Sequence, residues 1–297
     1  MQSLYGTDCA SHANVGGFVT YCKQREKEAA TARLSGFYTV RDASADTPVL
    51  GLGNDWSRRL FDGDFYRSNV ADEGLPAVSL VFVQSKDGNT VAANPSTLGG
   101  GESDKHLIYE GLSRVDADAV MAGAATARGV RMVFSIWHPE LVSLRLERGH
   151  ARHPAQVVVT GRGDVPIEKG LMFNEPSLRV FLITKTATAP GLRARLGDRG
   201  WVDVIDAGEA VSLTSAMRQL HARGLRVISC VGGRQTATAM IRERLVSDLY
   251  LTTSAIEAGE PDTPLYSGPR VQTRQLLDKE GRGHEAGIRF EHLTFER

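Results

Sequence analysis

The chain has 297 residues, of which 41% are hydrophobic and 24% charged, an ordinary composition for a globular protein with a sizeable core. Its 35 basic and 35 acidic residues balance and no apolar run is long enough to span a membrane, so we expect neither nucleic acid nor a membrane as a partner. The three cysteines form no CxxC pair, which argues against a disulfide framework or a cysteine zinc site and favours a reducing, cytoplasmic setting.

Residues 1–75 differ in character from the rest of the chain. They carry mixed charge around residues 23–28, scattered glycines and only short apolar clusters. We expect an N-terminal extension over 1–75 and one main domain over 76–297. The apolar side chains of Trp56, Leu60, Phe61 and Phe65 predict that the extension packs as an arm against that domain.

From residue 76 onward, short apolar segments alternate with helix-like stretches. The predicted strands are 78–84, 119–122, 156–160, 180–184, 202–206, 227–231 and 249–256. These runs lack strict alternation, which indicates strands buried on both faces of a parallel sheet. Residues 212–223 place apolar side chains at spacings of three and four before Gly224, the pattern of a helix between parallel strands. The tail, 271–277 and 288–295 around the turn 281–283, predicts an antiparallel hairpin, so we expect an α/β fold with a mixed, mainly parallel sheet.

The segment 230–236 joins the apolar run 227–231 to Gly232 and Gly233 and then to a helix-forming stretch, 237–245. Glycines let main chain approach an anion closely, and the free amides and dipole of a helix start favour negative charge. A tight structural turn also uses paired glycines, so the segment alone leaves both interpretations open. Its context favours a phosphate site.

That context is a set of polar or glycine-containing segments that follow predicted strands. They are 85–89, 123–128, 160–162 and 231–236. Ligands of open α/β sheets bind at the carboxyl ends of the strands. The combination therefore predicts a small-molecule site at this edge.

In order and spacing, five segments resemble the C-terminal reductase domain of the bifunctional riboflavin-pathway deaminase-reductases, in the dihydrofolate-reductase-like superfamily. They are Ser85-x-Asp87-Gly88, 99–105, 116–126, Gly232-Gly233 and 245–251. The resemblance covers about 78–256 and extends to the C-terminal hairpin. It implies a three-layer dihydrofolate-reductase-like fold, a homodimer, and NADPH-dependent hydride transfer to a nitrogen-rich heterocycle or its attached imine-like carbon.

The resemblance also implies which residues hold NADPH. One turn is formed by Gly123 and Thr126, the second wall by Gly232, Gly233, Arg234, Gln235 and Thr236, and the 2′-phosphate contact by Thr160 and Arg162. A hydroxyl and a guanidinium at that last position favour NADPH over NADH. For Arg162, a solvated loop arginine remains the alternative, because Gly-Arg-Gly-Asp also reads as a turn.

On the substrate side, the candidates are Ser85, Asp87, Ser103 and Asp104. Ser103 suits a helix N-cap and Asp104 the first helical turn, so both also have a structural explanation. Asp87 before Gly88 is typical of a turn. By resemblance, Asp104 is the candidate catalytic acid. No metal site is expected, because His106 and His138 lack metal-ligand spacing with other residues.

The chain also departs from the family pattern. Val81 and Val231 stand where those reductases carry a lysine and a glutamate facing the pyrimidine, and 127–131 is basic rather than acidic. The deaminase motif, His-x-Glu with a later Pro-Cys-x-x-Cys, does not occur. We expect a stand-alone NADPH-dependent reductase of a pyrimidine-like or pterin-like compound. A dihydrofolate reductase proper and a non-catalytic nucleotide-binding module remain the alternatives.

Overall fold

The computed structural model describes residues 12–69 and 74–296. Its strands are β1 (Phe37–Asp42), β2 (Val49–Gly51), β3 (Tyr66–Ser68), β4 (Ala77–Gln84), β5 (Ala119–Gly123), β6 (Ala155–Val159), β7 (Val180–Thr184), β8 (Val202–Asp206), β9 (Val227–Cys230), β10 (Asp248–Thr253), β11 (Thr273–Gly281) and β12 (Arg289–Phe295). Its α-helices are α1 (His12–Thr31), α2 (Asp55–Phe61), α3 (Gly101–Ser103), α4 (Pro139–Glu147), α5 (Ala189–Leu196), α6 (Leu213–Ala222) and α7 (Arg234–Arg242). A π-helix, Asp104–Tyr109, continues α3. No described helix is long and apolar enough to cross a membrane.

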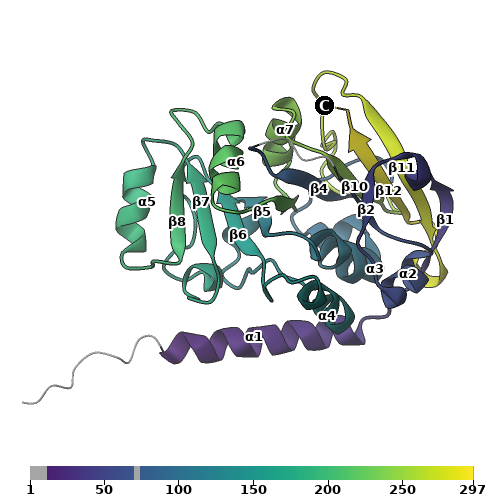
Figure 1. Cartoon of the computed structure of the whole chain (residues 1–297), viewed down its shortest axis with the longest axis horizontal. Helices are drawn as coiled ribbons and strands as arrows, with labels where there is room; N and C mark the ends of the chain where they lie inside the picture. The colour runs from purple at the N-terminus through teal and green to yellow at the C-terminus, as the bar shows by residue number, and fades with distance from the viewer. Residues whose placement is uncertain (1–11, 70–73, 297) are drawn as a thin grey trace, which may run out of the picture.

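A ten-stranded sheet forms the centre of the molecule, with the order β1-β11-β12-β10-β4-β9-β5-β6-β7-β8 (Figure 1). The strands from β10 to β8 in that order run parallel, whereas β12, β11 and β1 add on antiparallel. The mixed sheet and the C-terminal hairpin are confirmed. Strand β7 shows why the parallel part forms, because all five of its residues are buried and only a sheet covered on both faces hides them all.

Helices cover both faces of the sheet and make three layers. Apolar side chains of α6 and α7 pack on one face, and those of α1, α4 and α5 join the core cluster of the other. Helix α6 begins where its cap predicts, since the Ser212 side chain accepts a hydrogen bond from the Ser215 amide at 3.2 Å. Gly224, with φ of 89°, follows the end of that helix.

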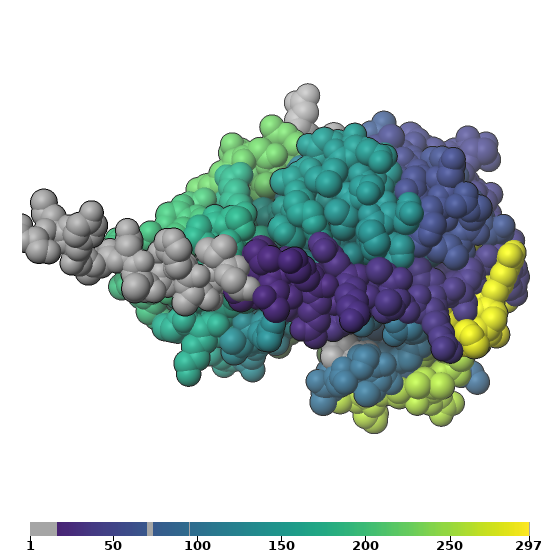
Figure 2. Space-filling model, turned by 90° about the horizontal axis from the view of Figure 1, so that it is seen from below, coloured from purple at the N-terminus to yellow at the C-terminus, as the bar shows by residue number. Residues whose placement is uncertain are grey.

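The segment before β4 is built into the main sheet. Strand β1 pairs with β11, and Phe61 and Phe65 pack against Phe290 of β12 with ring centroids 5.1 and 5.9 Å apart. Lys279 of β11 donates to the Thr39 side chain at 2.8 Å. Figure 2 shows α1 as a purple band across the face of the molecule that is seen from below. The predicted packing of the apolar side chains is confirmed, but the sequence did not predict that residues 37–42 become a strand of the sheet.

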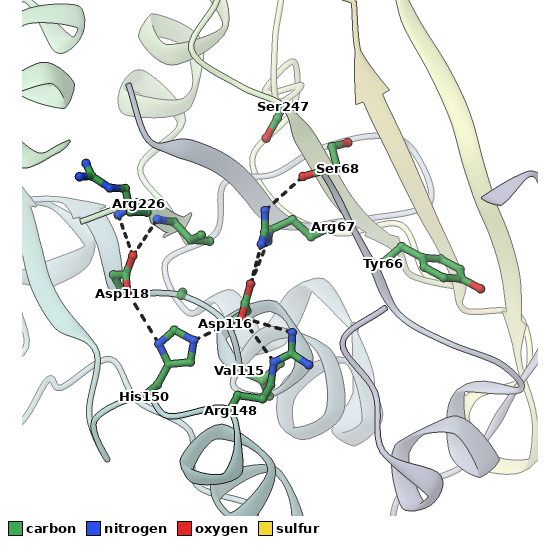
Figure 3. A network of polar contacts seen from close by, with 12 residues as sticks. Tyr66, Arg67, Ser68, Val115, Asp116, Asp118, Arg148, His150, Arg226 and Ser247 are labelled. Atoms are coloured by element: carbon green, nitrogen blue, oxygen red, sulfur yellow. Dashed lines mark hydrogen bonds and ion pairs between the residues drawn. The ribbon is translucent and has the colours of Figure 1, made fainter. Parts of the chain in front are cut away.

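An ionic network ties the same segment to the amino edge of the sheet (Figure 3). The Asp116 carboxylate lies 2.7 Å from the Arg67 guanidinium, 3.3 Å from that of Arg148 and 3.2 Å from the His150 ring. Burial raises the pKa of Asp116, but the hydrogen bonds from His150 and Arg67 and the nearby charges outweigh it and hold that pKa well below its usual range. Asp118, two residues on, accepts from the Val227 amide at 2.9 Å. This network holds the amino ends of β5 and β9 in place. It thereby also positions the carboxyl ends of these two strands.

Candidate active site

Two turns meet at the carboxyl ends of β5 and β9. The Gly123 amide donates to the Gly232 carbonyl at 3.0 Å. A Cβ at Gly123 would lie 2.9 Å from the Thr236 hydroxyl, and one at Gly232 would lie 3.2 Å from that of Thr126. These glycines are therefore required for the turns to pack on each other. The structure brings Gly123, Thr126, Gly232, Gly233 and Thr236 together, as the cofactor assignment needs.

Helix α7 begins directly at this junction. Gly233 is its N-cap, with φ of 84°, and no side chain caps the helix among the described residues. The first helical hydrogen bond runs from the Ala237 amide to the Gly233 carbonyl at 3.0 Å. The amides of residues 234–236 precede that bond and lie at the positive end of the helix dipole. This arrangement suits a pyrophosphate, which needs donors rather than a shaped side-chain pocket.

The first side chains of α7 differ in how well they are placed to contact an anion at the helix start. The Arg234 guanidinium donates through Nε to the Pro264 carbonyl at 2.6 Å, so it ties the helix start to a loop. Gln235 is exposed, whereas Thr236 is buried against the β5 turn. The backbone of this segment is therefore better placed than Arg234 to meet an anion.

The predicted 2′-phosphate position directly follows the neighbouring strand, β6. Thr160 is buried and its hydroxyl accepts from the Gly163 amide at 3.0 Å, while Arg162 is exposed. A Cβ on Gly161 would lie 3.3 Å from Cε of Lys185, so the lysine chain runs against the same turn. Sequence reasoning missed Lys185. The available signal was its place directly after β7, which matches the place of Thr160 directly after β6.

Ser85 and Asp87 lie in the turn after β4 and bind each other. The buried Ser85 hydroxyl donates to the Asp87 carboxylate at 2.5 Å, and the Asn89 side chain donates to its other oxygen at 2.7 Å. The hydrogen bond from Ser85 lowers the pKa of Asp87. These hydrogen bonds give both residues a structural role in the turn, and the exposed Asp87 carboxylate already accepts two of them.

Ser103 does not cap a helix, and that expectation is wrong. Helix α3 begins at Gly101, whose φ of 84° turns the chain into the helix three residues early, and it continues through Asp104 without a break. The Ser103 hydroxyl instead donates to the Ser35 carbonyl at 2.7 Å and accepts from the Ser35 amide at 3.0 Å. Its observed role is to bind the segment before β1.

Asp104 is buried over the carboxyl ends of β4 and β10. The Thr252 hydroxyl donates to its carboxyl group at 2.5 Å, and Thr252 pairs with Val83 near the ends of the two strands. Burial raises the pKa of Asp104 to about 7, with a further rise from the charge of Glu285 and an opposing effect from the Thr252 hydrogen bond. The carboxyl group can therefore hold a proton near neutral pH. Thr252 and Glu285 come from distant segments and were not among the predicted residues.

The same helical segment reaches the α7 junction. The Tyr109 hydroxyl donates to the Val231 carbonyl at 3.2 Å, one residue before the paired glycines. Val81 and Val231, which replace charged residues of the family pattern, are buried with exposed fractions of 2% and 4%. This edge of the sheet therefore combines two buried acids, Asp104 and Glu285, with buried apolar side chains at positions 81 and 231.

A family model, the RibD C-terminal domain, matches residues 76–286. The chain belongs to this family. The RibD C-terminal domain here is 25% identical over 151 residues to the 2,5-diamino-6-ribosylamino-4(3H)-pyrimidinone 5′-phosphate reductase of Archaeoglobus fulgidus, covering 51% of this chain and 68% of that protein. It is 26% identical over 212 residues to the riboflavin biosynthesis protein RibD of Chlamydia trachomatis, covering 70% of this chain and 53% of the relative.

The fold has a solved counterpart in a pyrimidine reductase-like protein from Corynebacterium diphtheriae. The two share 21% sequence identity with a TM-score of 0.63, over 75% of this chain and 92% of that one. The α/β fold with a mixed, mainly parallel sheet and the riboflavin-pathway family expected from the sequence are thereby confirmed. The relatives are reductases, so the chain is an oxidoreductase. Its family implies a nicotinamide cofactor, without indicating which one.

Proposed function

We propose that the chain is an NADPH-dependent reductase whose substrate is a phosphoribosylated aminopyrimidine of the kind named for the Archaeoglobus relative. The observation that carries the proposal is Asp104, a buried carboxyl group that can hold a proton near pH 7 at the edge where α7 begins. A reductase of an imine-like carbon needs both a hydride and a proton. Asp104 and Tyr109 lie at opposite ends of one π-helix, and Tyr109 contacts Val231 beside the start of α7.

The residues around α7 would hold the cofactor. The amides of residues 234–236 and the hydroxyls of Thr126 and Thr236 offer donors to a pyrophosphate. Arg162 and Lys185 offer two cations beside Thr160 to a 2′-phosphate, which supports NADPH over NADH. When bound, the reduced nicotinamide supplies the hydride.

Asp104 would supply the proton that accompanies the hydride. Its carboxyl group protonates the nitrogen of the acceptor as the adjacent carbon gains the hydride, and Thr252 holds the group in one orientation. Burial of the Asp104 side chain keeps it from water and maintains the raised pKa. Because Asp104 must be protonated to act, activity falls as pH rises through about 7.

The test is NADPH oxidation, followed at 340 nm, with the ribosylaminopyrimidine phosphate and with dihydrofolate as separate acceptors. We expect turnover with the aminopyrimidine, and a loss of roughly a hundredfold or more in kcat for Asp104→Asn. Turnover with dihydrofolate but not with the aminopyrimidine would show that the proposed substrate is wrong. If the protein binds NADPH but neither acceptor oxidises it, the chain is a non-catalytic nucleotide-binding module.

A further inference from the structure

A large groove lies at the far end of α7 from the cofactor site. Its volume is about 1290 Å³, and it runs between the end of α7, the segment 266–273 and the end of β12. Tyr266 and Phe295 line it and are both half-buried against the core cluster beneath. Two flat aromatic surfaces are therefore held in place beside an opening large enough for a ligand.

Three arginines line the same groove. Arg242, Arg244 and Arg270 are exposed, and within residues 12–69 and 74–296 none of their guanidinium groups has an ion pair or a hydrogen bond. Glu296 is the acidic side chain among the described lining residues. The chain as a whole is neutral, so this excess of positive charge is local.

Arg244 also occupies an unfavourable backbone conformation. Its φ is 54°, in the left-handed region that favours glycine after the end of a helix. A glycine here would remove that strain but would leave the groove without one of its cations. Strain of this kind at a non-glycine residue accompanies functional sites.

We propose that this groove is a second ligand site, which binds a nucleotide with its base against Tyr266 and Phe295 and its phosphate on Arg242, Arg244 and Arg270. Unpaired guanidinium groups recognise phosphate through paired hydrogen bonds, and aromatic faces stack on a planar base. Helix α7 is nine residues long, so its two ends lie roughly 12 Å apart. The groove is thus distinct from the phosphate site at the start of the same helix.

Calorimetric titration with AMP tests the proposal on protein already saturated with NADPH, so that the first site is filled. We expect one AMP per chain, bound at least tenfold more tightly than either adenosine or inorganic phosphate, because the groove offers contacts to both halves. Arg270→Gln and Arg244→Gly should each weaken AMP binding about tenfold. NADPH binding should stay unchanged in both variants.

Arg244→Gly is the informative variant, because relief of strain should leave its thermal stability equal to or above that of the wild type. Weaker AMP binding by this variant therefore cannot come from misfolding. Arg218→Gln is the matched control, since Arg218 is an exposed arginine on α6 outside the groove. Absence of AMP binding, or equal binding by all variants, would overturn the proposal. If sedimentation shows a wild-type dimer that dissociates in the groove variants, the groove binds a second copy of the chain instead.

Discussion

The buried carboxyl group of Asp104 predicts an unusual dependence of stability on pH. Its pKa rises from an ordinary 3.8 to about 7 in the folded protein, so folding favours the protonated form. The stabilisation is therefore complete below about pH 4 and is lost as pH rises through about 7. The difference between the two pKa values corresponds to about 4 kcal/mol in the free energy of unfolding, and about 3 kcal/mol of it is lost between pH 5 and pH 8.

Replacement by asparagine removes this dependence, because an amide stays neutral over the whole range. The free energy of unfolding of Asp104→Asn should exceed that of the wild type at pH 8, and the difference should shrink by about 3 kcal/mol at pH 5. Urea unfolding at both pH values measures it. Glu285→Gln is the companion variant, because removal of its charge should lower the pKa of Asp104 and shift the transition to lower pH. Identical pH dependence in wild type and Asp104→Asn would refute a raised pKa at this position.

Three further perturbations probe the site and its support. Gly233 has φ of 84°, and a Cβ there would lie 3.4 Å from Gly123 Cα, so Gly233→Ala should weaken NADPH binding at least tenfold. Gly224→Ala is the control, because Gly224 has φ of 89° but open space around it. Both variants should lose about 1 kcal/mol of stability, and only Gly233→Ala should lose binding. Arg162→Ala and Lys185→Ala should each reduce the preference for NADPH over NADH about tenfold by calorimetry; unchanged affinities for both cofactors would contradict the 2′-phosphate assignment. Asp116→Asn should lower the free energy of unfolding by about 2 kcal/mol at pH 7 in urea, with a smaller difference below pH 4, because the carboxylate stabilises the fold only while it is ionised.

The sequence predicted those parts of the fold that local patterns determine. Strands such as β7 are continuous apolar runs, and α6 has both a serine cap and a terminal glycine. Strand β1 escaped prediction because five of its six residues are not fully buried, so its pairing with β11 depends on a segment more than 200 residues away. Long-range pairing of this kind leaves little local signal.

The candidate site shows the same division. The glycines at 123, 232 and 233 were candidates because they follow predicted strands, and the structure packs their turns against each other. Ser103 was misassigned because the positive φ of Gly101 starts the helix early, which residue preferences do not reveal. Burial of Asp104 could not be predicted, because it depends on Thr252, 148 residues further along the chain.

We expect the edge around α7 to bind NADPH in preference to NADH, and calorimetric titration of the wild-type protein with each cofactor measures both affinities. Tight binding of NADPH and clearly weaker binding of NADH is the expected result. Binding of neither cofactor would contradict it, and the turns at residues 123 and 232 would then serve packing alone.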